Sequence, residues 1–431
     1  MKRRQFLHSA GAAMLLGAGT GCASVGGRAR PHVVVVGGGY GGATAARYVR
    51  LWSAGAIDVT LVEPQAQFVS CPLSNLVLGG AMEIGGLTMS LDALATHHGV
   101  RLVRDRVSAI DAARRTVVLA GGPTLSYDRL IVSPGVELQW DQLPGMSQPG
   151  AHDNILHAWK AGPQTLALRA QLQAMPDGGV FAMTIPPAPY RCPPGPYERA
   201  SQVAFYFSRH KPRSKVLILD ANDDVVSKGA LFKKVWRERY PGMIDYRPGF
   251  RTVDVDVRAR SAISELGDTV RADVLNVIPP QRAGSIAVQS GLANANGRWC
   301  AVDFLSFAST AAPYIHVLGD AIQTAPLMPK SAHMANQHAK VCAAAVVDLL
   351  SGRAPDPQPM LTNTCYSFVS DRDVIHVASV HAYNAAQKTL LVVPGSGGVS
   401  AGPSALEGQY ALNWAQNIWA DTLGYPEPKQ A

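Results

Sequence analysis

The feature that most constrains the fold of this chain is the stretch from Val33 to Gly42, which reads VVVVGGGYGG. Four consecutive β-branched residues are typical of a buried strand in a parallel sheet. Gly37, Gly39 and Gly42 then have the G-x-G-x-x-G spacing, and the alanine-rich segment after them predicts a helix. Such a turn lets the backbone approach a pyrophosphate closely, at the positive end of the helix dipole. The stretch therefore predicts a dinucleotide-binding strand–turn–helix unit.

A carboxylate at the expected distance strengthens this prediction. Residues 58–62 predict the neighbouring strand, and Glu63 follows them, 21 residues after Gly42. In dinucleotide-binding domains an acidic residue at this position accepts hydrogen bonds from ribose hydroxyls. We therefore predict that Gly37, Gly39, Gly42 and Glu63 bind an adenine dinucleotide. An ordinary glycine-rich turn is the less favoured alternative.

Composition allows several domains and excludes some partners. The chain has 431 residues, of which 47% are hydrophobic and 16% charged, and this balance is typical of a folded protein with two or three domains. The formal net charge is +8, but no arginine cluster interleaves with aromatic residues, so we expect no nucleic-acid partner. No stretch reaches the roughly 18 to 20 apolar residues of a transmembrane helix.

Residues 1–30 are predicted to be an export signal. Arg3 and Arg4 begin a motif that resembles the twin-arginine signal, and a short apolar segment, residues 10–21, follows them. We therefore expect a periplasmic protein that is exported by the twin-arginine route, which carries folded proteins. Cys22 follows a poor lipoprotein motif, so simple cleavage is favoured over lipid anchoring.

Cysteine and histidine spacing argues against a metal site. After residue 30 the chain contains five cysteines, an odd number, so at least one is not in an internal disulfide. The absence of a C-x-x-C-H motif excludes a covalently attached c-type haem on this chain, and neither C-x-x-C nor H-E-x-x-H occurs. Cys300 and Cys342 lie in apolar surroundings and are predicted core residues.

A second strand–turn–helix unit begins near residue 178 but has a different turn. A strand is predicted over 178–185 and another over 215–220, with a helix from Ala200 to Phe207. The turn between the first strand and the helix is rich in proline, and proline has no N–H to donate to a phosphate. This unit is therefore predicted to have lost nicotinamide binding. Cys192 lies in the turn, where a helix N-terminus would favour its thiolate.

Three further segments indicate which dinucleotide binds. Residues 127–135 resemble the Y-D-x-L-I-x-A-x-G segment of the glutathione reductase-like flavoproteins, which have two dinucleotide-binding domains. Residues 314–321 form a strand followed by Gly-Asp-Ala, and this resemblance places Asp320 on the flavin ribityl or phosphate. A helix over 332–350 would direct its N-terminus at the flavin. We also expect residues 67–75 to form a loop at the carboxyl edge of the sheet and residues 100–107 to form a strand.

Together, these residues resemble the flavoprotein subunit of flavocytochrome c sulfide dehydrogenase, from about residue 31 onward. The most specific segments are residues 71–75, 191–200 and 363–367, which read CPLSN, RCPPGPYERA and NTCYS. The resemblance implies FAD bound covalently through Cys71, a redox-active disulfide between Cys192 and Cys365, and a separate c-type cytochrome subunit that accepts the electrons. The relatives of that family include sulfide:quinone reductases.

The predicted fold class is α/β, with two Rossmann-like dinucleotide-binding-type domains and a small C-terminal α+β domain. We assign residues 31–145 and 282–355 to the FAD-binding domain. Residues 146–281 are assigned to the second Rossmann-like domain, and residues 356–431 to the C-terminal flavin-binding domain.

The predicted reaction is the oxidation of sulfide. A disulfide accepts attack by hydrosulfide and gives a persulfide and a thiolate, from which electrons pass to the flavin and then singly to haem. Glu198 is a candidate acid or base in this reaction, and a simple carboxylate at a helix N-terminus is an equally weighted alternative. We further predict that Val107, Pro134, Lys330 and Trp414 neighbour the cofactor, with packing the favoured role of Trp414.

Two other functions fit the same segments. The first is an NAD(P)H-linked flavin reductase, and the second is a non-catalytic flavoprotein that binds a carrier protein of sulfur oxidation. Cys192 and Cys365 could also form a purely structural bridge, although their position beside a cofactor favours redox chemistry.

Overall fold

The computed structural model describes residues 30–425, and the predicted export signal lies outside them. The first part of the fold is a seven-stranded sheet in the order β19-β20-β21-β9-β1-β2-β5. The strands from β21 to β5 are parallel, and β19 and β20 form an antiparallel edge. The bounds are β1 (His32–Val36), β2 (Asp58–Val62), β5 (Arg101–Val103), β9 (Arg129–Val132), β19 (Val302–Asp303), β20 (Ala308–Ser309) and β21 (Ile315–Val317).

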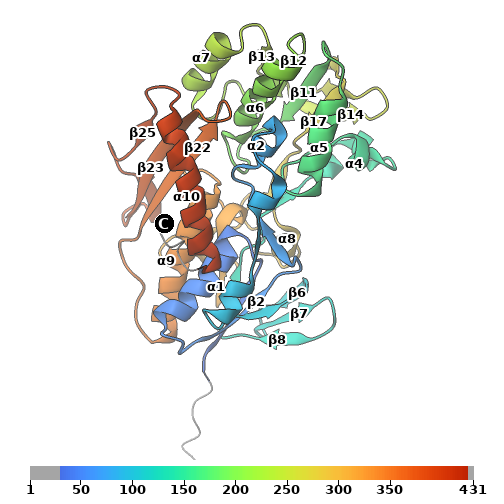
Figure 1. Ribbon diagram of the computed structural model, residues 1–431. Coiled ribbons are helices and arrows are strands. Elements are labelled where there is room, and N and C mark those ends of the chain that lie inside the picture. The colour runs from blue at the N-terminus through green and yellow to red at the C-terminus, as the bar shows by residue number, and fades with distance from the viewer. Residues whose placement is uncertain (1–29, 426–431) are drawn as a thin grey trace, which may run out of the picture. The chain divides into compact units, whose positions relative to one another are not determined.

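Helices pack against this sheet. The valines of β1 are buried, as expected for a strand with neighbours on both sides. Figure 1 shows α1 beside α9, with the C-terminal helix α10 next to them. The bounds are α1 (Tyr40–Trp52), α3 (Asp92–Thr96), α8 (Ser285–Gln289), α9 (Ala332–Leu350) and the short 3-10 turn η4 (Gly319–Ala321).

Two of the predicted segments around this sheet are wrong in detail. Residues 100–107 do not form one strand, because β5 ends at Val103 and β6 begins at Val107 in a separate three-stranded sheet. Residues 67–75 are not a continuous loop, because β3 pairs with β4 and α2 begins at Ser74. The bounds are β3 (Gln67–Val69), β4 (Thr88–Ser90), β6 (Val107–Asp111), β7 (Thr116–Leu119), β8 (Thr124–Ser126), α2 (Ser74–Gly79) and the 3-10 turn η1 (Ile84–Leu87).

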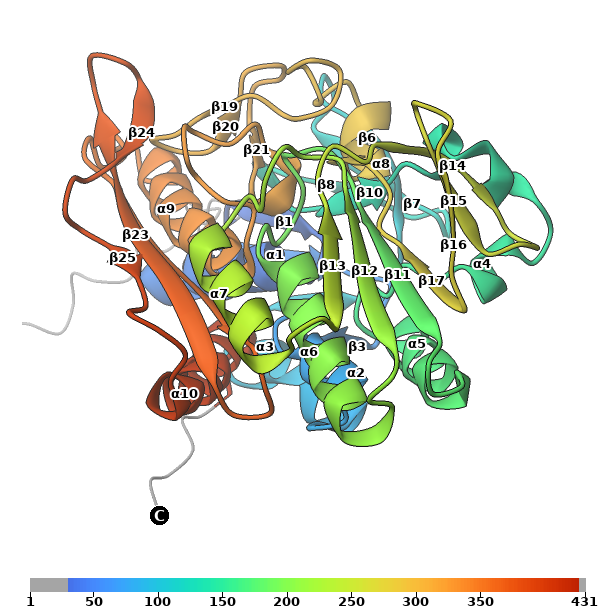
Figure 2. The same cartoon turned by 90° about the horizontal axis from the view of Figure 1, so that it is seen from above.

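The second part of the fold is a four-stranded parallel sheet in the order β13-β12-β11-β17. Figure 2 shows these strands side by side, with α6 and α5 along one face. The main bounds are β11 (Val180–Ile185), β12 (Lys215–Asp220), β13 (Ile244–Arg247), β17 (Val274–Val277), α5 (Pro163–Ala174), α6 (Gly195–His210) and α7 (Gly229–Arg239). An antiparallel sheet extends this part, with β14 (Thr252–Asp256), β15 (Ser261–Ser264), β16 (Thr269–Arg271) and the nearby α4 (Ala151–Asn154).

The helix predicted over Ala200–Phe207 is longer than expected. It begins at Gly195 and ends at His210, so its first turn includes Pro196 and Glu198. Proline is compatible with the first turn because the N–H it lacks would have no partner inside the helix. The proline-rich sequence therefore begins this helix instead of delaying it.

The third part is an antiparallel sheet with one long helix. Strands β22 and β23 pair along nine residues, from Met360 with Ala382 to Phe368 with Val374. The segment between β24 and α10 contains the short strand β25, which pairs with β23. The bounds are β22 (Met360–Phe368), β23 (Val374–Asn384), β24 (Thr389–Val392), β25 (Gly398–Val399) and α10 (Ala405–Leu423).

Two connections join the parts. The chain passes from the first to the second sheet near β10 (Val136–Leu138) and returns at β18 (Gln281–Ala283), and these two strands pair with each other. The 3-10 turns η2 (Trp140–Gln142) and η3 (Pro144–Ser147) follow β10. The predicted fold class, two Rossmann-like units and a small α+β unit, is confirmed. The domain limits stay predictions.

Within residues 30–425 we find no helix that combines the length and the apolar character needed to cross a membrane.

Candidate functional site

The turn after β1 has the geometry of a dinucleotide loop. Gly37 has φ +97°, a conformation that residues with a side chain rarely adopt. A Cβ on Gly42 would lie 1.8 Å from the carbonyl oxygen of Gly37, so a side chain there would prevent the helix from packing on the turn. A Cβ on Gly39, in contrast, would meet no atom within 4 Å. Gly39 therefore faces open space at the N-terminus of α1, where a phosphate can approach the backbone.

Glu63 lies beside this turn. One carboxylate oxygen, Oε2, accepts a hydrogen bond of 2.7 Å from the backbone N–H of Gly38, and Oε1 accepts one of 2.8 Å from the N–H of Gln65. These two bonds fix the carboxylate at the edge of the site. A carboxylate can accept more than two hydrogen bonds, so both oxygens can also accept hydrogen bonds from ribose hydroxyls.

Most of the predicted site residues line one cavity of about 380 Å³. The cavity lies where the carboxyl ends of the first sheet meet the N-termini of α6 and α9, and β22 and α10 complete its wall. In open α/β folds this is the edge where ligands bind. The predicted residues that line it are Gly37, Gly39, Glu63, Cys71, Pro134, Cys192, Glu198, Asp320, Cys365 and Trp414.

Three predicted residues do not line the cavity. Gly42 supports the turn from behind, through its contact with Gly37. Val107 is buried in β6, where it pairs with Leu119. Lys330 is buried with its Nζ donating to the backbone oxygens of Asp320, at 2.9 Å, and of Ile322, at 2.5 Å.

Lys330 instead supports two parts of the site. Its ammonium lies 3.6 Å from the centre of the Trp299 ring, and burial lowers its pKa to about 7. Its backbone oxygen accepts a hydrogen bond of 2.8 Å from the N–H of Cys192. Lys330 therefore holds the Asp320 turn with its side chain and the Cys192 turn with its backbone.

Asp320 provides a test of whether a flavin dinucleotide fits. Its Oδ1 is buried and has no hydrogen-bond partner in the protein, and burial raises the pKa of this carboxyl. The indole Nε1 of Trp159, which also lines the cavity, is likewise buried and unpaired. Buried polar atoms without partners cost about 1–3 kcal/mol each. With the open space at Gly39, these atoms fit a ligand that has hydroxyl and phosphate groups.

The three predicted redox or covalent cysteines come from three distant segments. Cys71 precedes α2, Cys192 precedes α6 and Cys365 lies in β22, yet all three line the same cavity. Each is a half-buried free thiol. Cys192 has φ +59°, an uncommon conformation for a residue with a side chain.

The expectation that the helix N-terminus favours the Cys192 thiolate is wrong. Burial raises the pKa of the Cys192 thiol well above its usual value, and the neighbouring Cys365 and Glu198 add to this effect, while Arg191 opposes it. Burial also raises the pKa of Cys365, although Lys228 opposes that shift. Desolvation therefore outweighs the helix dipole.

The first turn of α6 is filled by its own loop. The N–H of Gly195 donates to the carbonyl oxygen of Cys192 at 2.8 Å. A Cβ on Gly195 would lie 2.9 Å from the Cys192 sulfur and 2.8 Å from the Trp159 ring. A cysteine and a tryptophan therefore occupy the space that a pyrophosphate would need, a cause that is separate from the missing N–H groups of the prolines.

Glu198 is held in a network that sequence reasoning identified only in part. Its Oε1 accepts a 2.9 Å hydrogen bond from the N–H of Phe368, and its Oε2 accepts a 3.1 Å bond from Asn75. Asn75 in turn accepts a 3.1 Å bond from Arg199. Burial raises the pKa of Glu198 and lowers that of Arg199 to about 10.

No role was predicted from the sequence for four polar residues of the site: Asn75, Arg191, Arg199 and Lys228. The first three lie inside the segments CPLSN and RCPPGPYERA, so their place in a family-specific motif could have marked them as functional residues. Arg199 is fully buried, and its guanidinium also donates to the backbone oxygens of residues 157 and 158. Lys228 lies in no motif, and only the tertiary structure brings it to Cys365.

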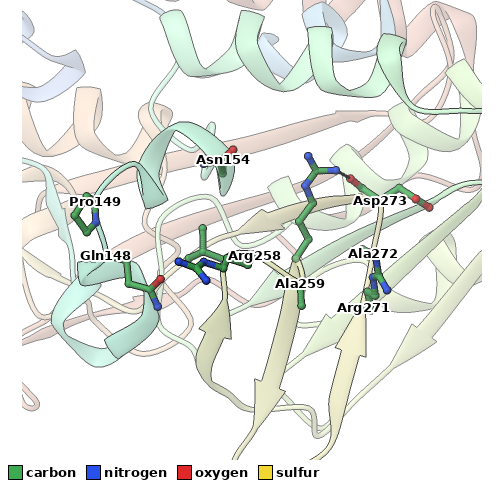
Figure 3. A pocket seen from close by; sticks show the side chains of 10 residues that line it. Gln148, Pro149, Asn154, Arg258, Ala259, Arg271, Ala272 and Asp273 are labelled. Atoms are coloured by element: carbon green, nitrogen blue, oxygen red, sulfur yellow. Dashed lines mark hydrogen bonds between the residues drawn. The ribbon is translucent and has the colours of Figure 1, made fainter.

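A second cavity, of about 550 Å³, lies at the opposite end of the second sheet. Figure 3 shows Arg258, Arg271 and Asp273 around it, and the Arg260 guanidinium donates to the backbone oxygen of Asp273 at 2.8 Å. No cysteine or histidine lines this cavity, and it shares no residue with the cavity at the dinucleotide loop. The predicted redox cysteines therefore all line the first cavity. Residues 30–425 contain no group of three or more potential metal ligands.

Comparisons with known proteins identify the family. A model of the pyridine nucleotide-disulphide oxidoreductases matches residues 31–173. The central domain of the sulfide dehydrogenase [flavocytochrome c] flavoprotein chain matches residues 165–279, and the flavocytochrome c sulphide dehydrogenase flavin-binding domain matches residues 357–423. A 46-residue stretch is 60% identical to the sulfide dehydrogenase [flavocytochrome c] flavoprotein chain of Chlorobaculum thiosulfatiphilum, and covers 94% of that sequence and 11% of this chain.

The chain belongs to the flavocytochrome c sulfide dehydrogenase flavoprotein family. The family resemblance drawn from the sequence is therefore confirmed. This family is one of the sulfide-oxidising flavoproteins, and its flavin-binding domains indicate FAD as the cofactor.

Longer matches at lower identity link the chain to sulfide:quinone oxidoreductases. The mitochondrial sulfide:quinone oxidoreductases of Mus musculus and Dictyostelium discoideum are each 25% identical to the chain, over 300 and 276 residues. These matches cover 67% and 61% of this chain, and 65% and 59% of the relatives, which is less than two thirds of their length. The structure of the sulfide:quinone oxidoreductase from Aquifex aeolicus has a TM-score of 0.74 at 18% identity and covers 93% of both chains, which shows a shared fold.

Proposed function

We propose that this chain oxidises hydrogen sulfide at the Cys192–Cys365 pair and passes the electrons, through FAD, to a c-type cytochrome on a separate chain. The observation that carries the proposal is the meeting of two cysteines from distant segments with the dinucleotide loop and Asp320 at one cavity. The family models named for flavocytochrome c support the cytochrome as acceptor.

In the proposed reaction the cysteine pair acts as a disulfide. Hydrosulfide attacks one sulfur, the S–S bond breaks, and a new S–S bond forms in a cysteine persulfide while the other cysteine leaves as a thiolate. The sulfide sulfur is oxidised and the leaving cysteine sulfur takes the electron pair. FAD, when bound, supplies an acceptor for two electrons that can release them one at a time.

The residues around the cavity favour an anionic sulfur. Arg191 and Arg199 line it, and the N-terminus of α9 is directed to the same space through Ser331 and Ala332. Positive groups and helix N-termini stabilise anions, so they attract hydrosulfide and oppose the desolvation that raises the pKa of both thiols. Glu198 is the proposed group that gives or takes the proton, because its raised pKa keeps a protonated form available nearer to neutral pH.

Anaerobic addition of sulfide to the purified flavoprotein tests the proposal. We expect bleaching of the flavin absorbance by sulfide, followed by reduction of added cytochrome c. Cys192→Ser and Cys365→Ser should each abolish sulfide turnover while the flavin stays bound, and Cys300→Ser, a change in the core, serves as a control. Rapid bleaching by NADH with no response to sulfide would contradict the proposal and favour an NAD(P)H-linked reductase.

The electron acceptor is tested with the same protein. A c-type cytochrome and a soluble ubiquinone analogue are compared as acceptors at equal concentration. Faster turnover with the cytochrome supports the proposal. Turnover with the quinone alone would contradict it and would match the sulfide:quinone oxidoreductases to which the chain is similar.

Covalent attachment of FAD through Cys71 is part of the proposal. Cys71 lines the cavity as a free thiol and its Sγ lies 3.9 Å from the backbone oxygen of Trp159. After denaturation in acid, the yellow colour should stay with the polypeptide, and Cys71→Ser should release it. Release of all flavin from the unchanged chain would contradict covalent attachment.

We also propose export to the periplasm by the twin-arginine route. The proposal rests on Arg3 and Arg4, which lie outside the described residues. Replacing both arginines with lysine should retain the flavoprotein in the cytoplasm, as measured by cell fractionation. Unchanged export would contradict it.

A further inference from the structure

Lys228 is a buried cation whose role the family assignment does not explain. Its side chain is 8% exposed. Its Nζ donates three hydrogen bonds, to the backbone oxygen of Cys365 at 2.9 Å, to the hydroxyl of Ser367 at 2.7 Å and to the backbone oxygen of Ile375 at 3.2 Å. All three acceptors are neutral, so none of these bonds balances the charge.

The backbone position of Lys228 is unfavourable for a lysine. Lys228 is the N-cap of α7, where the helix dipole repels a cation. Its backbone has φ +57°, which is uncommon for a residue with a side chain. The Phe232 ring of α7 lies 5.6 Å from the ammonium, but no carboxylate of residues 30–425 pairs with it. Negative charge nearby would therefore stabilise this buried cation.

The groups near Lys228 that can carry negative charge include the two cysteines of the proposed pair. Burial lowers the pKa of Lys228 to about 8, and Cys365, Glu198, Cys192 and Glu407 oppose this shift, with Cys365 the strongest of the four. Cys365 belongs to β22, Glu198 to α6, and Glu407 to α10. Glu407 is itself paired with His376 of β23, at 2.9 Å.

The surroundings of the two sulfurs differ. Cys365 Sγ accepts a hydrogen bond of 3.4 Å from the side-chain amide of Asn363 and lies 3.7 Å from the oxygen of the same amide. After burial, Cys365 and Glu198 raise the pKa of Cys192, and Arg191 opposes them more strongly than Lys228 does. Glu198 also raises the pKa of Cys365, but its effect there is small and Lys228 is the strongest opposing group. An anion is therefore better supported on Cys365 than on Cys192.

We propose that Lys228 is a positioning residue that stabilises a thiolate on Cys365, so that hydrosulfide attacks Cys192 and Cys365 is the leaving sulfur. The inference rests on the proposed function. The Cys192–Cys365 bond breaks, the sulfide sulfur bonds to Cys192 Sγ, and the electron pair goes to Sγ of Cys365, the residue whose backbone oxygen accepts a hydrogen bond from the ammonium. The disulfide is the oxidant, and the proton of hydrosulfide stays with the new persulfide until a base removes it. A thiol with a lower pKa is the better leaving group in this exchange.

The first test locates the persulfide. The flavin-loaded protein, with its cysteine pair oxidised, is mixed with one equivalent of sulfide without oxygen and quenched with iodoacetamide, and peptides are analysed by mass spectrometry. The expected products are an alkylated persulfide on Cys192 and an alkylated thiol on Cys365. A persulfide on Cys365 would overturn the inference while leaving sulfide oxidation intact. A persulfide on neither cysteine would contradict the proposed function as well.

The second test needs no sulfide and measures the role of Lys228 directly. In the reduced, flavin-loaded protein, the alkylation rates of Cys365 and Cys192 are followed against pH. Lys228→Met should lower the rate at Cys365 by about ten-fold or more at pH 7.5, because one unit of pKa changes the thiolate fraction ten-fold. The rate at Cys192 should change less.

Three further variants separate charge from structure. Lys228→Gln keeps N–H donors for the neighbouring oxygens but not the charge, so it should behave like Lys228→Met, and Lys228→Arg should restore reactivity. Lys211→Met removes a lysine that also donates to backbone oxygens, those of Gln173 and Met175, and it should change neither cysteine. An unchanged Cys365 rate in the folded Lys228→Gln protein would refute the proposal.

Discussion

Glu63 and Asp320 both lie at the cavity, but their carboxylates are held differently. Glu63 accepts two backbone N–H groups in the protein itself, whereas Oδ1 of Asp320 is buried without a partner. The backbone of Asp320 is fixed by Lys330, so the carboxylate cannot turn away easily to solvent. Asp320 is therefore the residue whose hydrogen bond depends most on a bound ligand.

Replacing Asp320 should weaken the flavin more than the fold. We expect Asp320→Ala, made with Cys71→Ser so that binding is reversible, to raise the dissociation constant of FAD by about ten- to one hundred-fold. This range corresponds to about 1.4–3 kcal/mol for a buried hydroxyl donor of the ligand that loses its acceptor. Titration of the apoprotein by fluorescence measures it. An unchanged affinity with the same melting temperature would exclude the ribityl or phosphate contact.

Glu198 allows a test of its two interpretations. Glu198→Gln keeps an oxygen for the Phe368 N–H but cannot exchange a proton at neutral pH. If Glu198 acts as acid or base, the turnover number should fall by about 10²-fold or more, and the limb of the pH profile that reports its raised pKa should disappear. If the variant has the turnover and pH profile of the parent protein, Glu198 is not the acid or base. Its role is then to orient Asn75 at the helix N-terminus.

At the scale of elements, two strand-to-helix turns have diverged. The turn from β1 to α1 keeps Gly39 open, while the turn from β11 to α6 is filled by Cys192 and Trp159 against Gly195. The helices present equivalent N-termini, but only the first has space for a phosphate. The second turn instead brings a sulfur to the cavity.

Glycine substitutions separate packing from binding in the β1–α1 turn. Gly42→Ala places a methyl group 1.8 Å from the Gly37 oxygen, so it should destabilise the protein by about 3 kcal/mol or prevent folding. Gly39→Ala meets no atom and should keep the melting temperature of the apoprotein while reducing flavin content. Thermal unfolding and the ratio of flavin to protein provide the two measurements. If both variants were equally stable, the assignment of Gly42 to packing and of Gly39 to flavin binding would be wrong.

At the scale of the whole molecule, the cavity needs all three parts of the fold. The first sheet supplies the dinucleotide loop, the second part supplies Cys192 and Glu198, and the third supplies Cys365 and Trp414. The Glu198 carboxylate joins α6 to β22 through the Phe368 N–H, and Lys228 joins α7 to the same strand. The two cysteines are therefore positioned by contacts between parts that are far apart in the sequence.

Buried histidines should make the stability of the whole protein fall in mild acid. Burial lowers the pKa of His338 to about 3, against about 6.5 in an unfolded chain. Between these values the unfolded chain binds a proton that the native protein does not, so stability is present above pH 6.5 and is lost as pH falls. The contribution is about 1.4 kcal/mol per pH unit for this group.

His338→Asn isolates that contribution. Asn keeps an acceptor for the Gly319 N–H, which His338 Nδ1 accepts at 3.3 Å, but does not titrate. The difference in unfolding free energy between the parent and the variant should shrink as pH falls from 6.5 to 5. Chemical denaturation at several pH values measures it, and a constant difference would contradict a neutral buried histidine.

Local pattern predicted the elements that have strong periodicity. The strand of valines, the glycine spacing and the alanine-rich helix after residue 331 were readable because their chemistry is local. The start of α6 was placed at Ala200, five residues too late, because the proline-rich segment was assigned to the turn, although proline is compatible with a first helical turn. Val107 and Lys330 were assigned to the cofactor, but one packs in a small sheet and the other holds a turn.

The amino-acid sequence alone determined the fold class, the family and the dinucleotide loop of this protein. Backbone conformation, strand burial and the lack of N–H groups in proline are properties of neighbouring residues, so they can be read from a short stretch. Only the tertiary structure decided that Cys192, Cys365 and Lys228 meet, and that burial raises the pKa of both thiols. Those properties depend on desolvation and on charges from distant segments, which the order of residues along the chain does not reveal.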